Sequence, residues 1–217
     1  MRDLFYSLFL TLSIISTSIA ANANLDLSHS HSVGDLHDSG LHLKEMSSGI
    51  PGQAYIFQSH AMRLMLPTGR SLSITANRGR IDTDSQKITR ISITGYAMPQ
   101  DQAYLVASQF FDAFELDKAS LESWHEENKG RGIDVTRFSI SVNLGFYPRI
   151  SLAVLPSMNY LYPCVIRLLI SWDWRKHHDW DENRAWRELP EPPAGLADIS
   201  LNPPSGKVYD LKDAYNW

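Results

Sequence analysis

The chain has 217 residues, 43% of them hydrophobic, and its formal net charge at pH 7 is -4. This length suits one substantial core or two small ones, and the basic residues are scattered among acidic ones instead of forming the basic stripe that phosphate binding requires, so we expect no nucleic-acid partner. The single cysteine, Cys164, excludes an internal disulfide, and its apolar neighbours predict a buried, unreactive thiol.

The first 23 residues have the layout of a secretory signal peptide. Arg2 precedes an apolar run over 4–15, and small residues end in Ala-Asn-Ala at 21–23. The apolar run is about 12 residues long, whereas a membrane-spanning helix needs roughly 20. We expect cleavage after Ala23, with Ala20 as the alternative site. The mature protein is then secreted or periplasmic and has no stable membrane anchor.

Residues 24–52 are rich in Ser, Gly, His and Asp and lack both helical and alternating patterns, which predicts a flexible arm. His29 and His31 form a His-x-His pair, and an extended chain places both imidazoles on one side. The pair is a candidate site for zinc or copper, although no cysteine strengthens it. A solvated polar linker is the alternative interpretation. We expect no other cofactor.

Three strands are predicted next. The runs over 54–66, 71–75 and 87–94 alternate or are apolar, and turn residues separate them. The period then changes to that of a helix over 101–115. One face of that segment is apolar and is formed by Ala103, Ala107, Phe110, Phe111 and Phe114. A second, shorter helix is predicted over 117–128.

Three further strands are predicted over 136–144, 149–155 and 164–174. Short connections favour antiparallel pairing. The order of three strands, one or two helices and three strands predicts an α+β fold, in which a helix packs on one face of an antiparallel sheet of about six strands. We assign this single domain to residues 53–188. A Pro-rich extended tail follows over 189–217 and docks either on the domain or on a partner.

A polar cluster after the last strand is the first candidate for chemistry. His177, His178 and Asp179 are residue types that bind zinc, and Asp181 and Glu182 follow directly. However, two adjacent histidines diverge in both a strand and a helix, and no His-Glu-x-x-His motif accompanies them. A polar edge of the domain is the alternative interpretation.

Trp180, Arg184, Trp186 and Arg187 are the predicted binding residues. Trp180 and Trp186 lie outside the alternating pattern of the preceding strand. Trp and Arg are enriched at the energetic centres of protein interfaces. The alternatives are that these side chains anchor the tail or form an aromatic platform for a sugar.

The sequence contains no Gly-x-Ser-x-Gly elbow, phosphate loop or dinucleotide fingerprint, so an enzyme is the less favoured class. We expect an exported, non-enzymatic accessory protein that binds a protein partner, as inhibitors, immunity factors and envelope accessory proteins do. A metal-dependent hydrolase that uses residues 177–182 is one alternative. A metal-handling protein that uses the N-terminal histidines is the other.

Overall fold

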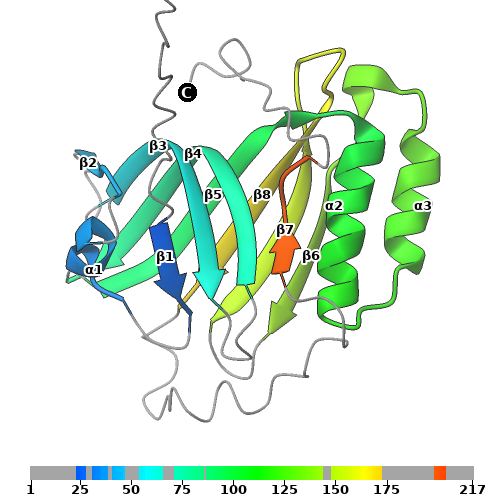
Figure 1. The fold of residues 1–217 in the computed structure, drawn as a ribbon. Coiled ribbons are helices and arrows are strands. Elements are labelled where there is room, and N and C mark those ends of the chain that lie inside the picture. Colours follow the sequence, from blue (N-terminus) through cyan, green and yellow to red (C-terminus); the bar gives the residue numbers. More distant parts are fainter. Residues whose placement is uncertain are drawn as a thin grey trace, which may run out of the picture.

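The computed structural model describes residues 23–27, 31–38, 41–46, 54–65, 71–85, 87–143, 148–172 and 198–203. Their elements are β1 (Ala23–Asp26), α1 (Val33–Asp38), β2 (Lys44–Met46), β3 (Ala54–Met65), β4 (Ser71–Asp84), β5 (Lys87–Met98), α2 (Gln100–Ala113), α3 (Ala119–Asn128), the 3-10 helix η1 (Gly132–Asp134), β6 (Phe138–Asn143), β7 (Arg149–Pro156), β8 (Cys164–Ser171) and β9 (Asp198–Ser200). All of these strands belong to one sheet (Figure 1).

The α+β class is confirmed, and the six longest strands form an antiparallel series in the order β3-β4-β5-β8-β7-β6. The described sheet nevertheless has nine strands instead of six, and it is mixed. β1 runs parallel to β3 and β9 runs parallel to β4, while β2 pairs antiparallel with β3. These additional strands have only three or four residues each, too few to produce a recognisable alternation.

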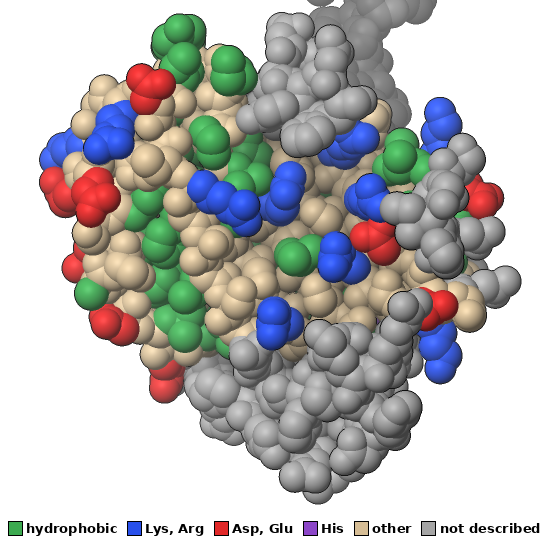
Figure 2. All heavy atoms as spheres, turned by 180° about the vertical axis from the view of Figure 1, so that it is seen from behind, with side chains coloured by type: hydrophobic (Ala, Val, Ile, Leu, Met, Phe, Trp, Pro, Cys, Tyr) green, Lys and Arg blue, Asp and Glu red, His purple; other side chains and the backbone are tan. Residues whose placement is uncertain are grey.

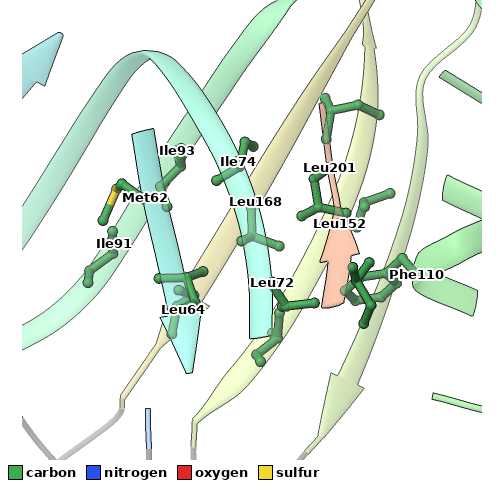
Figure 3. Packing of buried hydrophobic residues seen from close by; sticks show 14 of the residues in the cluster. Met62, Leu64, Leu72, Ile74, Ile91, Ile93, Phe110, Leu152, Leu168 and Leu201 are labelled. Atoms are coloured by element: carbon green, nitrogen blue, oxygen red, sulfur yellow. The ribbon is translucent and has the colours of Figure 1, made fainter. Parts of the chain in front are cut away.

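The inward faces of β3 and β4 reverse at the same level of the sheet, and in β3 the buried residues are Phe57 on one side of the reversal and Met62 and Leu64 on the other. Leu72 and Ile74 are buried before Asn77, whereas Gly79 and Ile81 are buried after it, so the inward parity of β4 changes. A regular strand keeps one parity inward along its whole length. Buried side chains of β3 and β4 meet those of β7 and β8 across the core (Figure 3).

The predicted aromatic helix is confirmed and closes one side of this core. Phe110, Phe111 and Phe114 of the α2 segment are all at most 5% exposed. The rings of Phe110 and Phe114 lie 4.9 Å apart, and the ring of Phe111 lies 6.0 Å from that of Phe138 in β6. α3 lies beside α2 on the outer side (Figure 1).

The described part of 24–52 differs from the flexible arm that we expected. It contains β1, α1 and β2, and its buried leucines are Leu25, Leu27, Leu36 and Leu41. These leucines pack their side chains into the core although most of their neighbours in the sequence are polar. The overall composition of the segment is polar, so it does not reveal them. The remaining residues of that range, and residues 1–22 of the predicted signal peptide, lie outside the described residues, whereas its last residue, Ala23, is the first residue of β1.

Part of the predicted C-terminal tail docks on the domain. β9 pairs with the start of β4, and Ile199 and Leu201 are buried. The Thr75 backbone N–H donates a 2.5 Å hydrogen bond to the Asn202 side-chain oxygen. Residues 198–203 therefore extend the sheet beside β4, beyond the point where the pairing of β4 with β5 ends.

Candidate functional site

Most of the predicted site residues lie outside the residues that the structure describes. They are the metal candidates His29, His177, His178 and Asp179 and the binding candidates Trp180, Arg184, Trp186 and Arg187. These hypotheses remain predictions. Of the predicted site residues, the structure places His31.

His31 lies between β1 and α1, two residues before α1 begins. Its Nε2 donates a hydrogen bond to the Asp26 carbonyl oxygen, and its Nδ1 lies 3.8 Å from an Asp35 carboxylate oxygen. The same carboxylate accepts a 2.7 Å hydrogen bond from the Ser32 backbone N–H, which lowers the pKa of Asp35. Among the described residues, no group of three or more His, Cys, Asp and Glu side chains is placed to hold a metal ion. His31 is thus engaged in a local structural contact.

Cys164 is buried, as predicted. Its side chain is 0% exposed, and desolvation raises the pKa of its thiol from 9.0 to about 12. A thiol in this environment is protonated at neutral pH, and a protonated thiol is a weak nucleophile. Cys164 is therefore a core residue and not a catalytic candidate.

The connection between β7 and β8, residues 157–163, exposes large apolar side chains. We call it the β7–β8 loop. Met158, Tyr160 and Leu161 are 65%, 76% and 74% exposed. The pairing of β7 with β8 continues up to Pro156 and Cys164, so the loop begins where the hairpin ladder ends. Figure 2 shows hydrophobic side chains at this end of the molecule.

Hydrogen bonds within the β7–β8 loop hold its backbone in place. The Ser157 N–H donates to the Pro163 carbonyl oxygen at 2.7 Å. The Asn159 side-chain oxygen accepts from the N–H groups of Leu161 at 3.0 Å and Tyr162 at 3.2 Å. An Asn side chain that bonds to N–H groups two and three residues later is a common way of fixing a turn. The exposed apolar side chains are thus carried on an ordered loop.

The loop lies next to the start of α2. Cys164 pairs with Met98 at the end of β5, and α2 begins two residues later at Gln100. Both features lie at the same end of the sheet (Figure 1). Leu105, in the second turn of α2, is 49% exposed and does not belong to the loop.

The sequence interpretation treated this loop as a simple connection. The available signal was a group of three large apolar residues, Met158, Tyr160 and Leu161, between two prolines and outside both flanking strand patterns. Such residues are buried more often than exposed, and one sequence does not reveal which occurs. Their exposure became evident only from the structure.

Comparisons of the chain with protein-family models, with curated proteins and with solved structures found no match. In the part of the chain that the structure describes, no helix is both long and apolar enough to cross a membrane.

Proposed function

We propose that this chain is an exported, non-enzymatic accessory protein that binds a protein partner, and that the β7–β8 loop forms the apolar centre of the contact. The observation that supports this most directly is the exposure of Met158, Tyr160 and Leu161 on a loop that its own hydrogen bonds hold in place. Exposed apolar groups that lie together are typical of surfaces that a partner covers.

The residue types and the order of the loop favour a protein partner. Tyr and Met are enriched in interface cores, where Tyr buries a large ring at a small entropic cost. An ordered loop also loses less conformational entropy when it binds than a mobile one does. Inhibitors often present a binding loop of this kind, with little change in backbone between the free and bound states. We therefore place the chain with inhibitors, immunity factors and envelope accessory proteins.

A pull-down tests the proposal. The exported protein is incubated with an envelope extract of its source cells, with and without a chelator, and bound proteins are identified by mass spectrometry. The variant is Met158→Ser/Tyr160→Ser/Leu161→Ser. Leu105→Ser is the control, because Leu105 is also exposed but lies on α2. Unchanged thermal unfolding midpoints verify that both variants fold.

We expect a stoichiometric partner that the wild-type protein and the Leu105 variant retain, that the loop variant loses, and that chelation does not release. Retention of the same partner by the loop variant would show that the loop is not the contact. Absence of any partner, together with zinc or copper in the purified protein, would overturn the binding function in favour of a metal-dependent one.

A further inference from the structure

The strand β6 ends the described sheet on one side, where Figure 1 shows it beyond β7. Among the described residues, β7 is the only strand that pairs with β6, and no backbone hydrogen bond outside that ladder involves a β6 residue. Alternate residues of an edge strand point their N–H and C=O groups away from the sheet. β6 therefore offers a row of backbone donors and acceptors to a further strand.

β6 lacks the features that usually protect a sheet edge from pairing. Such edges are kept short or carry charged residues, prolines or bulges. Residues 138–143 contain neither a charge nor a proline, and their ladder with β7 runs over all six residues without a shift in register. At the opposite end of the described sheet, β1 and β2 have only four and three residues. β6 is thus the edge at which a further strand can pair over the greater length.

The inward side chains of β6 are incompletely covered. Phe138 and Ile140 pack against the core but are only partly buried. The ring of Phe138 lies 6.0 Å from that of Phe111 in α2 and 5.8 Å from that of Trp124 in α3, so this side chain is held in place. A neighbouring strand would cover apolar surface of Phe138 and Ile140 that is still exposed, and removing that surface from water is favourable.

The residue types of β6 read the same in both directions about Ile140. Phe138 and Val142 are apolar, and a serine, Ser139 or Ser141, separates each of them from Ile140. Two strands related by a twofold axis run antiparallel, and each residue faces the corresponding position of the other copy. Pairing centred on Ile140 places Phe138 opposite Val142. It also places Ser139 opposite Ser141 and Ile140 opposite itself.

We propose that β6 pairs with β6 of a second copy of this chain, in the register centred on Ile140, and so joins the two sheets in a dimer. Opposite residues of an antiparallel pair point to the same face, so the apolar side chains meet on the inner side and the serines on the outer side. No like charges meet at the contact, because residues 138–142 carry no charge.

The serine contact of this dimer already has a counterpart on the other side of β6. Ser141 lies opposite Ser151 of β7, and their hydroxyl oxygens are 2.8 Å apart, a hydrogen-bonding distance. Pairing with a second copy repeats this contact between Ser139 and Ser141. The dimer contact is separate from the β7–β8 loop and does not depend on the proposed function.

A second copy fits β6 better than a strand of an unrelated protein does. Any extended segment can bond to the backbone of an edge strand, and its side chains then decide the specificity. Pairing about a twofold axis requires that each residue suit the residue at the mirrored position. The five residues 138–142 meet this requirement, which an unrelated strand would not impose.

The test is sedimentation velocity of the purified protein over a range of concentrations. Ser139→Lys/Ser141→Lys places lysine opposite lysine at two points of the contact. Ser139→Lys/Ser141→Glu is the matched control, because it changes the same two exposed residues and loses the same hydroxyls but places lysine opposite glutamate. The variant Met158→Ser/Tyr160→Ser/Leu161→Ser tests whether the β7–β8 loop contributes. Circular dichroism spectra like that of wild type verify that the variants fold.

We expect the wild-type protein and the loop variant to dimerise equally well. The dimer Kd of the lysine–lysine variant should rise at least about tenfold, whereas the lysine–glutamate variant should dimerise at least as tightly as wild type. A wild-type protein that stays monomeric at high micromolar concentration would overturn the proposal. Equal weakening in both charge variants would overturn the register centred on Ile140. Dimerisation that only the loop variant loses would overturn the proposal in favour of self-association through the loop.

Discussion

Ser157 and Pro163 face each other across the base of the β7–β8 loop, where the Ser157 backbone N–H donates a 2.7 Å hydrogen bond to the Pro163 carbonyl oxygen. This bond continues the β7–β8 ladder one step beyond Pro156 and Cys164. The apolar residues between them are therefore carried by a closed, hydrogen-bonded turn. A loop that is already ordered loses little backbone entropy when it binds a partner.

Asn159→Ala should loosen the loop without unfolding the domain. It removes the side-chain oxygen that accepts hydrogen bonds from the N–H groups of Leu161 and Tyr162. We expect the free energy of unfolding to fall by about 1 kcal/mol and the Leu161 amide to exchange hydrogen faster, whereas the Tyr162 amide keeps its 3.2 Å hydrogen bond to the Asn159 carbonyl oxygen. Asn159→Asp keeps an acceptor and serves as the control. Unchanged exchange in the alanine variant would show that the side chain does not order the loop.

Gly79→Ala should destabilise the protein at the level where β3 and β4 reverse their inward faces. A Cβ atom on Gly79 would lie 1.9 Å from Cζ of the buried Phe57 ring. We expect a loss of about 1–3 kcal/mol in the free energy of unfolding, measured by urea denaturation. Gly34→Ala is the matched control, because its Cβ would meet nothing closer than the Ser32 hydroxyl at 3.5 Å. Equal stabilities of the two variants would contradict this packing.

Hydrogen bonds of the Asn128 side chain link the end of α3 to the segment before β6, and its replacement should lower the free energy of unfolding. The side chain is 0% exposed, accepts a 2.6 Å hydrogen bond from the Thr136 N–H and donates a 2.7 Å bond to the Trp124 carbonyl oxygen. Asn128→Leu should therefore cost about 2 kcal/mol or more, because the Thr136 N–H and the Trp124 carbonyl oxygen lose these hydrogen bonds and the space around the amide is filled by an apolar side chain. Thr136→Val keeps the backbone N–H bond and should cost less. A reversed order of the two losses in thermal unfolding would argue against this assignment.

Cys164 should make the protein less stable at alkaline pH. Burial raises the pKa of the thiol from 9.0 to about 12, so between these values the unfolded chain releases a proton that the native chain retains. The free energy of unfolding should therefore fall as pH rises through this window, and Cys164→Ala should lack this part of the slope. Native Cys164 should also react with iodoacetamide far more slowly than the urea-unfolded protein. Equal rates in the two states would show that the thiol is accessible.

The spacing of apolar residues along the chain predicted the parts of the fold in which neighbouring residues decide which side chains face the core. Phe110 and Phe111 fall on the apolar face of a helix, so their burial could be inferred, and Phe138 lies on the inward face of a strand, so its packing against the core could be inferred as well. The strand β9 could not, because its three residues complete no period and its partner Leu72 lies far away in sequence. Its burial depends on tertiary contacts.

The functional surfaces were less accessible to sequence reasoning than the core. The β7–β8 loop lies beside the start of α2 only because Cys164 pairs with Met98, and local alternation does not specify that register. Similarly, nothing in the local sequence distinguishes an exposed Tyr160 from a buried one. An apolar surface of this kind becomes visible only after the fold is known.

Titration of the captured partner separates a loop-centred contact from any other. The wild-type protein is compared with the Met158→Ser/Tyr160→Ser/Leu161→Ser variant, and Leu105→Ser is the control. If the β7–β8 loop is the centre of the contact, the Kd of the triple variant should rise by about a hundredfold or more, while that of the control stays close to wild type. A triple variant that binds the partner within about twofold of wild type would contradict the account.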